Sequence, residues 1–185
     1  GGVGLILDHS KMITMDFKEV DNVVIVIGKT EGHLDQSLFA RNILDEKNGP
    51  PPEINLFNEK NNGETLLKLI ENNLIKSAHD VSLGGIITSI AKMCIKGKKG
   101  INLNMPKYLI NEIEYFFGED QGRYIIEVNN KDIKKVADIL NKNAVHYDEL
   151  GTITENELYI NEKTKVTIDE LKSSNKRWLT EYMSK

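Results

Sequence analysis

The chain has 185 residues, of which 39% are hydrophobic and 28% charged, and its formal net charge is −4 at pH 7. This length supports one domain with a sizeable core, and the negative charge with scattered basic residues argues against a nucleic-acid-binding protein. The one cysteine excludes a disulfide framework, and no uncharged apolar run is long enough to span a membrane, so we expect a cytoplasmic protein.

The first half of the chain reads as an entry segment followed by a strand and two helices. It begins GGVGLILDHS without an initiator Met, so we expect residues 1–20 to be the exit from a missing upstream domain and residues 21–185 to form the domain itself. The β-branched run at 23–28 predicts a strand buried on both faces. Residues 34–44 predict a helix that the prolines at 50–52 break. A second helix is expected over 56–72, with its later half on the sheet and residues 58–63 in solvent.

Residues 77–97 organise the rest of the chain. A strand over 74–82 leads into the pair Gly84-Gly85, and the following helix is apolar around most of its circumference, which predicts a buried helix. The unpaired N–H groups at its start could accept a phosphate or carboxylate, although paired glycines there also serve close packing or turn geometry. Asp80 could do acid–base work with His79, but capping of the helix by Asp80 or Ser82 is the favoured role. Cys94 lies within the apolar helix and is expected to be a buried small hydrophobe.

A second informative stretch is Gly118 to Arg123, GEDQGR, between a helix predicted over 108–117 and a strand predicted over 124–128. Two carboxylates, an amide and a guanidinium lie together here. The stretch is either a salt-bridged, capped turn or a ligand site. Magnesium could use at most one of Glu119 and Asp120, because adjacent side chains on a strand point apart.

The remaining elements predict the fold class. Residues 101–105 indicate a strand, 131–143 an amphipathic helix, 145–154, 158–160 and 164–168 further strands, and 168–183 a last helix. Strands and helices that alternate in this way favour an α/β or α+β fold, in which a mixed sheet is covered by helices.

Both informative stretches resemble motifs of the aminoimidazole ribonucleotide synthetase superfamily. SAHDVSLGGIITSIAKM, at 77–93, is similar to the AHDVSDGGL-type motif of the superfamily's C-terminal domain. GEDQGRYIIEV, at 118–128, is similar to the GESQSRY-type segment of the phosphoribosylformylglycinamidine synthase family. The opening GGVGLILDHSK, the segment 23–44 and KRWLTEYM near the end also resemble that family, in the same order. The chain resembles the last domain of the small form of this family, which lacks a glutaminase.

The resemblance implies an ATP-dependent carbon–nitrogen ligase of purine biosynthesis. Such enzymes use ATP to activate the formyl amide oxygen of formylglycinamide ribonucleotide, and glutamine-derived ammonia displaces the phosphate. ATP and magnesium are therefore expected in the full enzyme, with upstream domains of the same chain, a glutaminase and accessory subunits as partners. The family's acid–base histidine and most of its magnesium ligands belong to upstream domains. We therefore expect no catalytic residue and no metal ligand in this fragment, and no activity of the fragment alone.

The same resemblance suggests which residues could contact a ligand. The family's two halves are similar, and a Glu-Ser-Gln segment of the first half contacts substrate, so its equivalent at 119–121 would line an auxiliary nucleotide site or a structural remnant. Leu83 and Asp120 replace the family's usual Asp and Ser, and both changes favour a non-catalytic site. The candidates for ligand or phosphate binding are Asp80, Ser82, Gly84, Gly85, Glu119, Gln121 and Arg123.

The sequence allows two further possibilities. The domain could be a docking module without a ligand of its own, and the fragment could form a homodimer through the apolar start of the chain. A relative of selenophosphate-forming or thiamine-phosphate kinase enzymes is disfavoured by GEDQGR and by the tryptophan stretch near the C-terminus.

Overall fold

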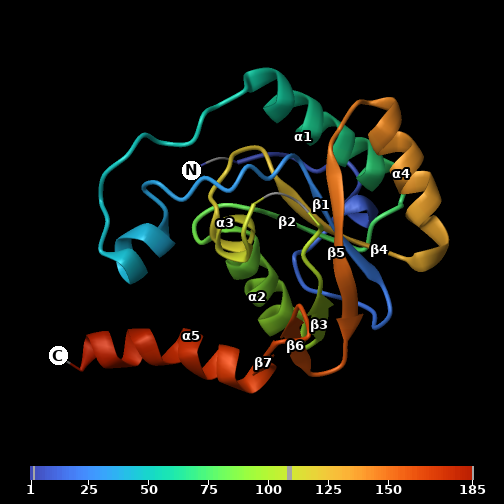
Figure 1. The fold of residues 1–185 in the computed structure, drawn as a ribbon. Coiled ribbons are helices and arrows are strands. Elements are labelled where there is room, and N and C mark those ends of the chain that lie inside the picture. The colour runs from blue at the N-terminus through green and yellow to red at the C-terminus, as the bar shows by residue number, and fades with distance from the viewer. Residues whose placement is uncertain (2, 108–109, 185) are drawn as a thin grey trace.

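A mixed β-sheet with helices on both faces forms the body of the domain. The computed structural model describes residues 1, 3–107 and 110–184. Within them one sheet has seven strands in the order β2-β4-β1-β5-β3-β6-β7, antiparallel except for the β3–β6 pair. The expected α/β (α+β) class with a mixed sheet and covering helices is confirmed (Figure 1).

The elements follow the predicted order along the chain. The strands are β1 (Val23–Ile27), β2 (Ser77–Asp80), β3 (Gly100–Leu103), β4 (Tyr124–Val128), β5 (Tyr147–Thr154), β6 (Glu157–Ile160) and β7 (Thr164–Thr167). The α-helices are α1 (Leu56–Glu71), α2 (Gly85–Gly97), α3 (Glu112–Phe117), α4 (Ile133–Lys142) and α5 (Ile168–Met183). The first part of the helix predicted over 108–117 includes residues 108–109, which lie outside the described residues.

The central strand β1 is buried on both faces, as predicted. Val24 and Val26 belong to a core cluster shared with α2 and α3, whereas Ile25 and Ile27 belong to a cluster shared with α1 and α4. This division follows from the alternation of side chains along a strand. Figure 1 shows α1 and α4 side by side on one side of the sheet and α2 with α3 on the other.

Two helix predictions need correction. The segment 34–44 is helical only towards its end, where Ala40–Leu44 form a single π-type turn. In α1 the segment 58–63 is not wholly in solvent, because Asn62 is buried and its side-chain amide donates to the Gly122 carbonyl at 2.9 Å. The Asn62 contact joins side chain and backbone 60 residues apart, which local spacing in the sequence cannot predict.

The buried carboxylate of Glu127 attaches the N-terminal segment to the sheet. Glu127 lies on β4 with no exposed surface. It accepts hydrogen bonds from the backbone N–H groups of Lys18 and Glu19 at 2.8 and 3.0 Å, and from the side chains of Asn22 and Ser77 at 2.7 and 3.0 Å. Phe17, 2% exposed, packs into the core beside this cluster. Residues 17–22 are thus fixed to the body of the domain.

The C-terminal half of α5 carries an exposed apolar face. Ile168 and Leu171 pack against the core, but Trp178 and Tyr182, stacked at 5.4 Å between ring centroids, are 66% and 62% exposed. In Figure 1 this red helix runs away from the sheet towards the C-terminus. Aromatic surface of this kind is typical of a contact region.

Cys94 is fully buried on α2, which confirms the expected small hydrophobe. Burial raises the pKa of its thiol to about 12, so almost no thiolate exists at neutral pH. We therefore predict that a thiol reagent such as Ellman's reagent reacts with the native chain only at the rate of unfolding, and completely in denaturant. Rapid modification of the native chain would contradict the buried position.

Candidate ligand site around the Gly118–Arg123 turn

Three segments far apart in sequence converge at one end of the sheet. In the antiparallel β1–β4 pair Ile27 lies opposite Tyr124, and in the β2–β4 pair Asp80 also lies opposite Tyr124. The loop after β1, the turn before β4 and the link from β2 to α2 therefore meet. The two stretches singled out in the sequence are brought together here.

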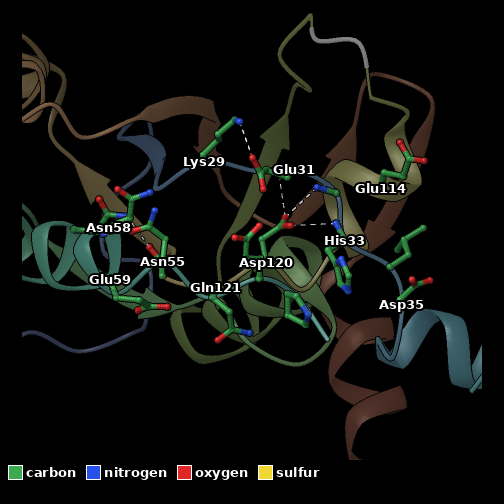
Figure 2. A pocket seen from close by; sticks show the side chains of 16 residues that line it. Lys29, Glu31, His33, Asp35, Asn55, Asn58, Glu59, Glu114, Asp120 and Gln121 are labelled. Atoms are coloured by element: carbon green, nitrogen blue, oxygen red, sulfur yellow. Dashed lines mark hydrogen bonds and ion pairs between the residues drawn. The ribbon is translucent and has the colours of Figure 1, made fainter. Parts of the chain in front are cut away.

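Asp120 binds the loop that follows β1. Its Oδ2 accepts from the backbone N–H groups of Glu31 and Gly32 at 3.1 and 3.0 Å, and its Oδ1 from that of His33 at 3.1 Å. We call these three N–H groups the 31–33 nest. Figure 2 shows the Asp120 carboxylate directed at it. Sequence reasoning missed the nest, for which the available signal was Gly32 between the strand predicted at 23–28 and the helix predicted at 34–44.

Glu119 binds the start of α2. Its Oε1 accepts from the backbone N–H groups of Gly84, at 2.8 Å, and Leu38, at 2.7 Å. The expectation that Asp80 or Ser82 caps this helix is wrong: the N-cap residue is Gly84, which has no side chain to donate or accept a capping hydrogen bond. A carboxylate from another segment supplies the negative charge that a helix N-terminus favours.

Arg123 stabilises the turn through hydrogen bonds from its buried guanidinium. Its guanidinium is buried and donates to the carbonyls of Gly118 and Asp120 at 2.7 and 3.2 Å and to the hydroxyl of Thr30 at 3.1 Å. One nitrogen lies 3.4 Å from Oδ2 of Asp120. Burial lowers the pKa of Arg123, and the nearby Asp120 carboxylate opposes that effect. GEDQGR thus forms a salt-bridged turn whose charged groups bind the chain itself.

The two glycines at the start of α2 allow close packing. Gly84 and Gly85 have φ values of +84° and +69°, which favour glycine. A Cβ on Gly85 would lie 2.6 Å from the carbonyl oxygen of Phe116. The packing role is thus visible in the backbone, and a ligand contact by these glycines stays a prediction.

His79 and Asp80 form a pair at the edge of the sheet. The His79 Nδ1 lies 3.0 Å from the Asp80 carboxylate, and the His79 Nε2 is buried without a hydrogen-bond partner among the described residues. Asp80 and Ser82 are exposed, and between them the N–H of Val81 donates to the carbonyl of Arg123 at 2.9 Å. Both residues thus adjoin the turn, whereas the hydrogen bonds to the 31–33 nest come from Asp120.

Burial lowers the pKa of His79 below its ordinary 6.5, and the Asp80 carboxylate only partly offsets this. Because the folded chain holds the neutral imidazole and the unfolded chain protonates more readily, the stability that His79 contributes is present above pH 6.5 and is lost as pH falls through its lower folded value. We predict that, in His79→Gln, the free energy of unfolding measured with urea falls less steeply as the pH is lowered below 6.5. The control His9→Gln, at an exposed position, should show the same pH dependence as the natural chain. Equal slopes in all three proteins would contradict the assignment.

A cavity of about 670 Å³ lies beside the turn, on the side of the 31–33 nest (Figure 2). Gln121 of the expected ligand-binding residues lines it, along with asparagines of α1 and its N-cap. The titratable residues in its lining are mainly acidic: they are Glu31, Asp35, Glu53, Glu59, Glu114 and Asp120, together with the basic residues Lys29 and His33. Among the residues described, no three or more His, Cys, Asp or Glu side chains are arranged to hold a metal ion. The cavity is thus a poor environment for a free polyphosphate.

Comparison with known proteins decides the family. The family described as AIR synthase related protein, C-terminal domain, matches residues 19–162. The chain belongs to this family. The match covers strands β1 to β6 and both stretches at the site, and it leaves residues 1–18, β7 and α5 outside.

Curated relatives carry this domain as part of a longer chain. The phosphoribosylformylglycinamidine synthase subunit PurL of Pelagibacter ubique is 68% identical over 183 residues, and that of Bartonella henselae is 35% identical over 182. The matches cover 99% and 98% of this chain but 25% of each relative. The chain therefore spans about a quarter of the length of these relatives.

Solved structures show the same fold. The PurL of T. maritima complexed with FGAR has a TM-score of 0.72 at 18% identity and covers 88% of this chain and 30% of that one. A thiamine-monophosphate kinase from Stenotrophomonas maltophilia matches less well, with a TM-score of 0.55 at 12% identity, covering 80% of this chain and 52% of that one. At these identities the likeness concerns the fold. As a further finding, no helix among the described residues is both long and apolar enough to span a membrane.

Proposed function

We propose that this chain is the C-terminal domain of a phosphoribosylformylglycinamidine synthase PurL subunit. The observation that carries the proposal is the 68% identity over 183 residues with a PurL subunit, in which GEDQGR and the glycine pair belong to the matched region. The full subunit would be a cytoplasmic ATP-dependent ligase of purine biosynthesis. It would convert formylglycinamide ribonucleotide and ammonia to the amidine.

In this proposal the chemistry belongs to the upstream part of the subunit. ATP and magnesium would bind there, residues 1–20 would be the exit from that part, and residues 21–185 would be the domain. A glutaminase and accessory subunits would be partners, and the solved PurLQS assembly of Thermotoga maritima, to which this fold is similar, supports that expectation. The 185-residue chain alone would be inactive.

The exposed apolar surfaces favour a docking role for this domain. Val3, Leu5 and Leu7 are between 86% and 105% exposed, and the face with Trp178 and Tyr182 is uncovered. We propose that the upstream part of the subunit covers these surfaces, because the relatives are about four times as long as this chain. The isolated chain could then form a homodimer through the same surfaces.

The test of the enzyme assignment uses the full-length subunit that contains these residues. We expect ADP formation that requires both formylglycinamide ribonucleotide and ammonium, with the amidine detected by mass spectrometry, and no turnover by residues 1–185 alone. A subunit from which this domain is deleted should be inactive. Absence of substrate-dependent ADP formation in the folded full-length subunit would refute the assignment.

Ligand binding by Asp80, Ser82, Gly84, Gly85, Glu119, Gln121 and Arg123 is a separate proposal. A ligand that binds the folded chain raises its melting temperature. The melting temperature of the 185-residue chain is therefore measured with and without Mg-ATP, Mg-ADP or formylglycinamide ribonucleotide. A saturable rise that Gln121→Ala abolishes would support a ligand site. If none of the three ligands raises the melting temperature, the ligand-site proposal fails and the docking role is favoured. Gln121 is the better position for this test, because Gly85→Ala would already clash with Phe116.

A further inference from the structure

The 31–33 nest has the geometry of an oxyanion-binding site. Three successive backbone N–H groups, those of Glu31, Gly32 and His33, point to one carboxylate. Gly32 has a φ of +82°, a left-handed conformation of the kind that turns neighbouring N–H groups into one concavity. Such concavities commonly bind phosphate.

In this chain the anion of the nest is Asp120. Both carboxylate oxygens are used, with three N–H···O distances of 3.0 to 3.1 Å. The side chain is 10% exposed, and the buried Arg123 lies 3.4 Å behind it. The loop therefore binds a carboxylate that lies 87 to 89 residues away in sequence.

The nest opens on the cavity. Glu31, Gly32, His33 and Asp120 all belong to the cavity lining. If the side chain at position 120 were short and neutral, the three N–H groups would face a space that admits small ions. The nearby carboxylates, among them Glu31 and Glu114, would keep the affinity for an anion low.

We propose that Asp120 is a built-in anionic ligand that closes the nest: it ties the loop after β1 to the turn before β4 and excludes free oxyanions. A short neutral residue at position 120 opens the nest to inorganic phosphate. This inference depends on the geometry of the turn and not on the proposed enzyme activity.

The test titrates inorganic phosphate into ¹⁵N-labelled chain at constant ionic strength and follows the backbone amide signals. In the natural chain the amides of Glu31, Gly32 and His33 stay unchanged. In Asp120→Ser they shift saturably. Glu119→Gln is the matched control, because its carboxylate binds Leu38 and Gly84 instead, so its loss leaves the 31–33 amides insensitive to phosphate. A saturable shift of the three amides in the natural chain overturns the proposal, as does a folded Asp120→Ser protein that shows none.

A second measurement covers the case in which Asp120→Ser does not fold. The natural chain is titrated with acid, and the amide signals of Glu31, Gly32 and His33 are followed together with the Asp120 carboxyl carbon. The three amides move with the protonation of Asp120, as hydrogen bonds to a carboxylate weaken when it becomes neutral. In Asp120→Asn that movement is absent. Amides in the natural chain that do not follow the Asp120 carboxyl overturn the proposal.

Discussion

Replacing Glu127 with alanine is expected to destabilise the chain by at least about 3 kcal/mol, because it leaves several buried donors without an acceptor. The donors are two backbone N–H groups of the entry segment and the side chains of Asn22 and Ser77. Since a whole domain is stable by only about 5–15 kcal/mol, the loss should be visible as a large fall in the urea midpoint. Residues 17–22 should also exchange their amide hydrogens faster than they do in the natural chain.

Two controls separate this effect from a general loss of charge. Glu127→Gln keeps the shape and one acceptor oxygen but places an NH₂ group among donors, so it should also destabilise, though less. Glu149→Ala, at an exposed position of β5, should change the unfolding free energy by no more than about 0.5 kcal/mol. Equal effects of Glu127→Ala and Glu149→Ala would contradict the role assigned to the buried carboxylate.

Arg123→Ala should have an effect of similar size, roughly 3–5 kcal/mol, since removing one member of a buried charged network leaves the others uncompensated. The guanidinium binds Gly118, Asp120 and Thr30 at once. Arg123→Lys should not rescue stability, because one ammonium cannot reproduce the forked geometry. Chemical denaturation measures both variants.

The matched control is Arg177→Ala, whose side chain on α5 is 71% exposed and pairs with Glu181. An exposed pair of this kind contributes at most about 1 kcal/mol. In addition, Arg123→Ala combined with Asp120→Asn should be less destabilised than the sum of the two single variants, because they share one network. Additive effects would show that Asp120 and Arg123 act independently.

The sequence by itself was sufficient for the elements whose pattern is local. The β-branched run of β1, the residues of β4 and the full extent of α5 follow from side-chain alternation, helical spacing and turn residues, which report on neighbours within a few positions. The glycine pair and GEDQGR could also be picked out as the place where a site would lie. Residue types alone predicted an α/β domain, and the family resemblance was needed to predict an enzyme class.

The tertiary structure decided what those residues do. Glu119, and not Asp80 or Ser82, binds the N–H of the N-cap residue of α2, and the backbone N–H groups that Asp120 and Glu127 bind lie 87 to 109 residues away. A sequence states which carboxylates exist but not which N–H groups they meet, because that depends on strand pairing. β4 pairs with both β1 and β2, and this pairing brings the turn, the loop and the helix start into contact.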